Sequence, residues 1–97
     1  MTGKDKQKLE ARAKVIKALG HPSRLLMVEE LADGELSVWE LTDKVGASIS
    51  TVSKHLSVLK NAGIVTDEKR GNQVFYRLRV PCILNFFGCV EAVLAQN

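Results

Sequence analysis

The sequence predicts a small, mainly α-helical domain with a two-stranded β-hairpin near its C-terminal end. The chain has 97 residues, which is room for one domain and no second, so residues 1–97 are expected to form a single unit. Hydrophobic residues make up 45% of the chain but aromatic residues only 5%, and this balance favours helices packed through aliphatic side chains. Apolar residues recur at helical spacing before and after one β-prone stretch, which places the hairpin between helices.

The first two helices are expected over residues 5–19 and 22–32. The first carries a narrow apolar stripe among its lysines, formed by Leu9, Ala13, Ile16 and Leu19. Pro22 suits the first turn of the second helix, because that position needs no backbone N–H. The second helix is expected to end near Asp33-Gly34.

The next two helices are marked by their capping residues. Ser37 and Glu40 have capping-box spacing, so a third helix begins after Ser37, and Gly46 is expected to end it. Ser48 is suited to cap a fourth helix, residues 49–61. A helix that stops at a glycine and is followed at once by another predicts a helix-turn-helix.

The rest of the chain predicts a hairpin and a last helix. Residues 64–70 and 73–79 are short, β-prone runs around Gly71-Asn72, which is typical of two strands joined by a tight turn. Pro81 is expected to open an apolar helix over residues 81–95. The order of elements is therefore ααααββα, which is that of a winged helix-turn-helix.

Charge is unevenly distributed along the chain. Residues 1–24 hold seven basic residues against two acidic ones, residues 25–47 hold six acidic residues against one basic, and residues 48–80 hold six basic against two acidic. The last basic segment coincides with the fourth helix and the hairpin. A basic segment on a candidate recognition element is a better sign of a nucleic-acid partner than the net charge of +3.

The fourth helix has an apolar side and a small, polar side. Val52, Leu56 and Leu59 recur at helical spacing and are expected to face the core. Small hydroxyl side chains let a helix enter the major groove closely, and lysine neutralises phosphate. The alternative is that any exposed helix face is polar, but the basic hairpin that follows favours DNA binding. The expected DNA-contacting residues are Ser50, Thr51, Ser53, Lys54, His55 and Ser57 of the helix and Lys69, Arg70, Asn72 and Gln73 of the hairpin.

Several runs of the chain resemble the ArsR/SmtB family of bacterial and archaeal repressors, in order and spacing, over about residues 12–80. The resemblance implies a homodimeric winged helix that blocks transcription at an operator in double-stranded DNA and is released by a metal, metalloid or redox signal. It also implies that residues 5–19 and 81–95 pair in the dimer, and that DNA is read by Ser50, Thr51, Ser53, Lys54 and His55. The runs are Lys17-Ala-Leu-Gly-His-Pro-Ser-Arg-Leu25, Glu35-Leu36 through Leu41, Ser48-Ile-Ser-Thr-Val-Ser-Lys-His-Leu56 and Leu59-Lys-Asn-Ala-Gly-Ile-Val65.

Two metal sites of that family do not match this sequence. The Cys-Val-Cys of arsenic sensors is replaced by Ser37-Val38-Trp39, and the last helix contains neither the Asp nor the His of the zinc sensors. The histidines of the chain are His21 and His55. We expect His21 to be structural at a helix start, and His55 to contact DNA or solvent.

Cys82 and Cys89 are the remaining candidates for a sensor. Their spacing of seven residues corresponds to nearly two helical turns, so both thiols are expected on one face of the last helix, about 10 Å apart along its axis. That separation exceeds the limit of about 7 Å for a disulfide. Two such helices crossing in a dimer would bring Cys82 of one chain towards Cys89 of the other, as a dithiol site or as disulfides. The alternative is that both are small apolar residues filling the interface.

The sequence requires no cofactor, and the inducer is the open question. Soft ions suit thiolates, so arsenite (first, because of the family), antimonite, cadmium and copper(I) are candidates, as are oxidants and persulfides. No catalytic motif is present, and a thiol oxidoreductase would have closer cysteines, so the chain is not expected to be an enzyme. The alternative function is a winged-helix regulator or protein-interaction module with structural cysteines. With no run of about 20 apolar residues and no signal peptide, a cytoplasmic location away from membranes is expected.

Overall fold

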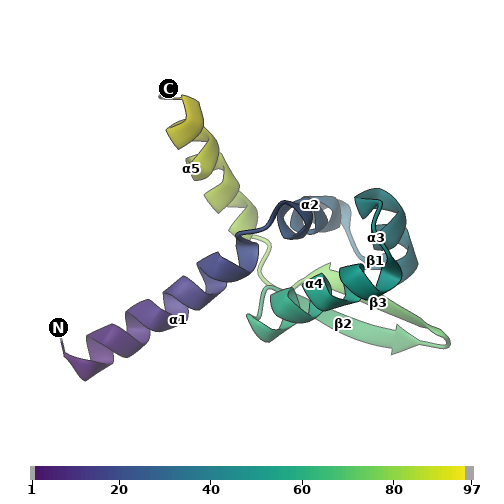
Figure 1. Ribbon diagram of the computed structural model, residues 1–97, viewed down its shortest axis with the longest axis horizontal. Helices are drawn as coiled ribbons and strands as arrows, with labels where there is room; N and C mark the ends of the chain where they lie inside the picture. Colours follow the sequence, from purple (N-terminus) through teal and green to yellow (C-terminus); the bar gives the residue numbers. More distant parts are fainter. Residues whose placement is uncertain (1, 96–97) are drawn as a thin grey trace.

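The computed structural model describes residues 2–95. Three helices pack against a small sheet to form a body, and the first and last helices extend away from it (Figure 1). The sheet is antiparallel, with strand order β1-β3-β2. The elements are α1 (Gly3–Leu19), α2 (Pro22–Glu30), a 3₁₀ turn (Leu31–Asp33), β1 (Leu36–Ser37), α3 (Val38–Val45), α4 (Ile49–Asn61), β2 (Val65–Arg70), β3 (Gln73–Leu78) and α5 (Ile83–Ala95).

The core lies between α2, α3, α4 and the sheet. Val52, Leu56 and Leu59 have no exposed surface, so the prediction that they face the core is confirmed. Burial of an aliphatic side chain of this size contributes about 1.5–3 kcal/mol to folding. The buried side chains that surround them are Met27, Val28, Leu31, Leu41, Ile64, Val65 and Tyr76. The apolar side of α4 therefore fixes which side of this helix remains available to a partner.

The local signals around α3 and α4 act as the sequence predicts. The Ser37 hydroxyl accepts from the Glu40 backbone N–H at 3.1 Å, and the Glu40 carboxylate accepts from the Ser37 N–H at 3.0 Å. Gly46 ends α3 with a φ of 73°, in the left-handed region that favours glycine. Ser48 caps α4 by accepting from the Thr51 N–H at 3.2 Å. These bonds set the turn between the two helices.

Two features of the sheet and of α2 differ from the sequence prediction. The hairpin is part of a three-stranded sheet, because Leu36 and Ser37 pair with Tyr76 and Phe75 of β3. A strand of two residues is too short to show an alternating pattern. The second helix ends at Glu30 rather than at residue 32, since the chain tightens into the 3₁₀ turn before Gly34.

The boundaries of the two outer helices also differ. Thr2 caps α1 by accepting from the Asp5 N–H, so the helix begins at Gly3 rather than at residue 5. The last helix begins at Ile83 rather than at residue 81, because Pro81 and Cys82 form a tight turn in which the Pro81 carbonyl accepts from the Leu84 N–H at 3.1 Å. The prediction that Pro81 opens this helix was wrong by two residues.

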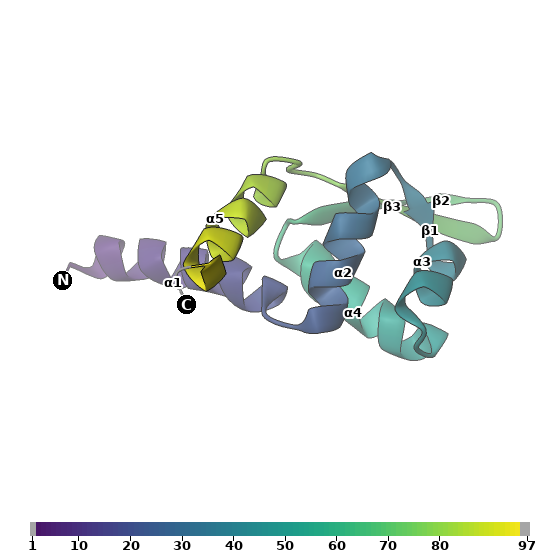
Figure 2. The same ribbon diagram turned by 90° about the horizontal axis from the view of Figure 1, so that it is seen from above.

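The outer helices leave much of their apolar surface exposed. No side chain between Ile83 and Ala95 is buried, and α1 buries only Ala18 and Leu19, at its C-terminal end. Figures 1 and 2 show both helices extending from the body on the side opposite the β2–β3 turn. Within residues 2–95, none of the helices has the length and apolar character needed to cross a membrane.

Candidate nucleic-acid interface

The polar side of α4 is open to solvent. Its exposed residues are Ser50, Thr51, Ser53, Lys54 and Ser57, and we call this set the α4 face. Hydroxyls cluster at its N-terminal end, where Ser48 Oγ lies 3.0 Å from Thr51 Oγ1 and 3.3 Å from Ser50 Oγ. Within the described chain, no carboxylate forms an ion pair with Lys54. The helix thus offers hydroxyls and one uncompensated cation beside a helix N-terminus, a combination that suits an anionic partner.

His55 is half-buried and lies apart from this open face. Its ring centroid lies 4.4 Å from that of His21, and the guanidinium Nη1 of Arg24 lies 3.2 Å from His55 Nδ1. Burial lowers the pKa of His55, and the charges of His21 and Arg24 lower it further. His21 is structural, as expected, because its Nδ1 accepts from the Ser23 N–H at 3.0 Å and caps α2. The structure therefore places His55 against α2.

The β2–β3 hairpin presents different side chains on its two faces, since side chains alternate along a strand. Asp67 faces α4, where its carboxylate forms a 3.0 Å ion pair with Lys60. Lys69, two residues further, lies on the same face of β2 and is exposed. None of the ion pairs found between residues 2 and 95 involves Lys69. In both ribbon views the β2–β3 turn and the N-terminal end of α4 lie at the same end of the molecule (Figures 1 and 2).

Arg70 lies on the opposite face of the hairpin, and its charge is already compensated. Its guanidinium donates to both carboxylate oxygens of Glu35, at 2.6 and 2.7 Å, and to Glu68 at 3.0 Å. It also lies 4.6 Å from the centre of the Phe75 ring, within the range of a cation–π contact. The hydrogen bond from Arg70 lowers the pKa of Glu35, and both carboxylates raise the pKa of Arg70. Sequence reasoning missed this cluster, because Glu35 is 35 residues away in the chain.

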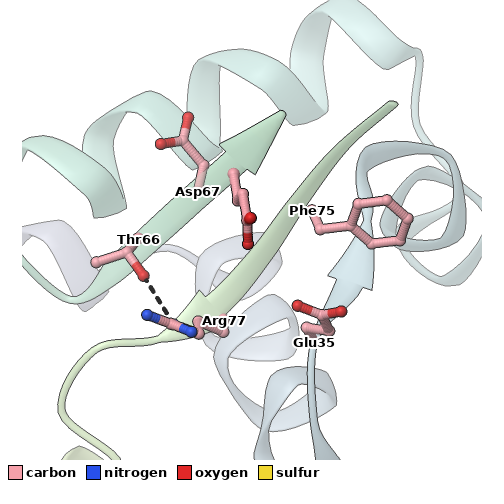
Figure 3. A pocket seen from close by; sticks show the side chains of 6 residues that line it. Glu35, Thr66, Asp67, Phe75 and Arg77 are labelled. Atoms are coloured by element: carbon pink, nitrogen blue, oxygen red, sulfur yellow. Dashed lines mark hydrogen bonds between the residues drawn. The ribbon is translucent and has the colours of Figure 1, made fainter. Parts of the chain in front are cut away.

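A shallow pocket adjoins this cluster on the same side of the sheet. Figure 3 shows Glu35 and Phe75 on one side of it and Thr66 with Arg77 on the other. Arg77 Nε donates to Thr66 Oγ1 at 3.3 Å. Carboxylates and guanidinium groups lie together here, so their charges largely cancel. This side of the hairpin therefore attracts phosphates less than the side that faces α4.

The remaining hairpin candidates lie at its turn. Asn72 follows Gly71 in the tight turn, and Gln73 begins β3 opposite Arg70. Both side chains are exposed. Lys69, Asn72 and Gln73 therefore form the exposed, polar tip of the hairpin.

Neither cysteine is buried. Cys89 is exposed on α5, and Cys82 is exposed in the turn that precedes it. Cys82 precedes α5, which begins at Ile83, so it is not one of the residues of this helix as the sequence predicts. Cys82 instead lines an apolar groove between α1 and α5, together with Arg12, Ile16 and Phe86. Among residues 2–95 of one protomer, no group of three or more His, Cys, Asp or Glu side chains is arranged to hold a metal ion.

Comparison with known proteins gives the family. A family model described as bacterial regulatory protein, arsR family, matches residues 21–67. The chain is 42% identical over 79 residues to a biofilm growth-associated repressor of Xylella fastidiosa. The matched region covers 80% of this chain and 69% of that protein. It is 40% identical over 70 residues to the HTH-type transcriptional repressor SmtB of Mycobacterium tuberculosis, covering 72% of this chain and 52% of that protein.

Solved structures share the whole architecture. The homodimeric winged helix-turn-helix DNA-binding domain Mb0332 of Mycobacterium bovis, a possible ArsR-family transcriptional regulator, has a TM-score of 0.84 at 28% identity, over 99% of this chain and 89% of that one. The transcriptional repressor BigR of Xylella fastidiosa has a TM-score of 0.77 at 35% identity, over 96% of both chains. The protein therefore belongs to the ArsR/SmtB family of DNA-binding transcriptional repressors with a winged helix-turn-helix fold, a family of regulators and not of enzymes.

Proposed function

We propose that the protein acts as a homodimer that places its two α4 faces in successive major grooves of an operator, about 34 Å apart. The observation that carries this proposal is the α4 face itself. Its hydroxyls and Lys54 are open to solvent, while Val52, Leu56 and Leu59 anchor the other side of the helix in the core. A helix whose apolar side is held in the core and whose polar side is exposed is suited to enter a groove without any rearrangement of the domain.

The dimer forms through α1 and α5. Several of their apolar side chains are exposed in the protomer, and exposed apolar patches mark interaction sites. The M. bovis domain of the same fold is a homodimer. The side chains concerned, with their exposed fractions, are Leu9 (49%), Ile16 (55%), Phe86 (39%), Val90 (41%), Val93 (67%) and Leu94 (59%).

A thiol-directed signal at Cys82 and Cys89 releases the operator. Cys82 lies in the groove between the two dimerisation helices and Cys89 is exposed on α5, so a change at either thiol alters how these helices pack. Thiolates bind soft ions, and arsenite is the first candidate because of the family. Peroxide gives the same outcome by oxidation. Cys82 of one protomer and Cys89 of its partner give up two protons and two electrons to form a disulfide, and the peroxide is reduced to two waters.

Operator release by the reduced protein tests the signal. The operator is first selected from a library of random DNA duplexes, and its binding is then followed by fluorescence anisotropy as arsenite, cadmium, zinc or peroxide is added. We expect release by at least one thiol-directed agent, with the protein in which Cys82 and Cys89 are both serine binding equally well but no longer responding. A double variant that is still released, or a wild-type protein that none of these agents releases, would contradict the role of the cysteines.

Lys69 and Arg70, the two cations next to the hairpin turn, are expected to contribute unequally to DNA binding. Lys69→Gln should lower the slope of log affinity against log salt by about one, because it removes one phosphate contact. Arg70→Gln should lower the slope by less, because Glu35 and Glu68 already compensate that charge. Anisotropy titrations at several salt concentrations measure both slopes. A larger loss for Arg70→Gln than for Lys69→Gln would show that Arg70 leaves its carboxylates to contact DNA.

A further inference from the structure

We propose that Arg24 is a positioning residue that ties the recognition helix α4 to the end of α1 through His55, and that protonation of His55 breaks this tie. The inference rests on the proposed function, in which α1 holds the dimer and α4 reads DNA. It assigns to Arg24 and His55 the task of fixing the orientation of α4 relative to α1.

One guanidinium group joins three helices. Arg24 belongs to α2, and its Nε donates to the backbone carbonyl of Ala18 at 2.6 Å. Ala18 lies in the last turn of α1, where carbonyl groups have no partner within the helix. The Nη1 of the same group lies 3.2 Å from His55 Nδ1 on α4. Because the guanidinium is planar and rigid, the bonds from its Nε and Nη1 fix the distance between the Ala18 carbonyl and His55 Nδ1.

The contact requires His55 to be neutral. Arg24 is always protonated and can only donate, so His55 Nδ1 must carry a lone pair and the ring proton must lie on Nε2. The ring of His21 lies 4.4 Å from that of His55 at an angle of 44°, and its own Nδ1 accepts from the Ser23 N–H. The charged and titratable groups that face His55 from the elements packed against it are thus His21, before α2, and Arg24, on α2. Neither supplies a negative charge.

Protonation of His55 therefore acts against the tie in two ways. It removes the acceptor for Arg24, and it places a second positive charge 3.2 Å from the guanidinium. The pKa of His55 lies below its usual value, first because of burial and then because of these positive neighbours. The pKa of histidine in the unfolded state is about 6.5. A histidine whose pKa is lowered by folding stabilises the native state fully at pH values above about 6.5, and this contribution is lost as the pH falls below that value.

The sign of the pH effect separates this role from direct DNA binding. If His55 only braced α4, operator affinity would fall on acidification, because the helix loses its fixed orientation. If His55 instead touched a phosphate, its protonation would add a positive charge at the interface and operator affinity would rise. The two roles predict opposite slopes over the same pH range.

The test is operator binding by the full-length protein between about pH 8 and pH 5.5, a range that spans the titration of histidine. Anisotropy is measured at constant ionic strength with the operator selected from random duplexes, and circular dichroism at each pH confirms that the protein is folded. We expect the affinity of the wild type to fall on acidification, because protonation of His55 removes the acceptor for Arg24. His55→Gln should remove the pH dependence, whatever its affinity at high pH, because its amide oxygen accepts from Arg24 without titrating.

Two further variants complete the test. His21→Ser is the matched control, because serine keeps an N-cap for α2 and does not titrate, so most of the pH dependence should remain. Arg24→Gln should weaken operator binding at high pH and flatten the profile. An affinity that rises or stays constant on acidification, or a fall that survives in His55→Gln, overturns the proposal. Failure of the wild type to bind any duplex at high pH would contradict the proposed function instead.

Discussion

A protein in which Ser50, Thr51, Ser53 and Lys54 are all replaced by alanine will bind its operator no better than random DNA. These side chains form most of the α4 face, whereas the residues that anchor the helix lie on its other side. The Ser48 cap also survives, because it accepts from the backbone N–H of residue 51. Specific binding exceeds non-specific binding by about 10³-fold or more in proteins of this kind, so a loss of that order is expected in anisotropy titrations against selected and random duplexes.

The single changes within this set should separate into two classes. Lys54→Ala should weaken binding to all sequences and lower its salt dependence, because it removes a phosphate charge. Ser50→Ala and Ser53→Ala should change the preferred sequence, because hydroxyls contact base edges. Asn61→Ala, at the far end of the same helix, is the matched control and should bind as the wild type does. If the fourfold variant melts normally and keeps its operator affinity, α4 is not the reading helix.

The second large effect is expected from a charge on α5. Val93 is 67% exposed in the protomer, so Val93→Glu should leave the fold intact but bury a carboxylate in the dimer, which is unfavourable. Sedimentation velocity should then show a monomer. Operator affinity should fall by about 10²–10⁴-fold, because joining two reading heads raises the effective concentration of the second one.

The control for this variant places the same charge elsewhere. Val58 is also exposed, at 39%, but lies on α4, and Val58→Glu should remain dimeric in sedimentation. A dimer that persists in Val93→Glu would show that the exposed side of α5 is not the interface.

The helix-turn-helix could be predicted from the sequence because its signals are local. The Ser37–Glu40 capping box, Gly46 and the Ser48 cap each act within four residues, and the structure contains all of them. The same is true of the polar side of α4, which follows from the helical spacing of its buried residues. Tertiary packing adds little to what such short-range patterns already define.

The features that the sequence did not predict depend on contacts between distant residues. Arg70 looked like a free cation at a hairpin tip, but Glu35 binds it from 35 positions away. His55 looked like part of the open α4 face, but Arg24 contacts it from 31 positions away. The strand β1 is visible only through its partner β3. No pattern of spacing encodes these pairings, so the charge state of the hairpin and the surroundings of His55 required the structure.

Hydroxyl-radical and methylation footprinting of the selected operator test the central claim most directly. The account predicts two protected half-sites, centred about 10 base pairs apart on one side of the duplex, with guanine N7 positions of the major groove protected in each. A single half-site, or protection confined to the minor groove, would mean that two α4 helices do not enter successive major grooves.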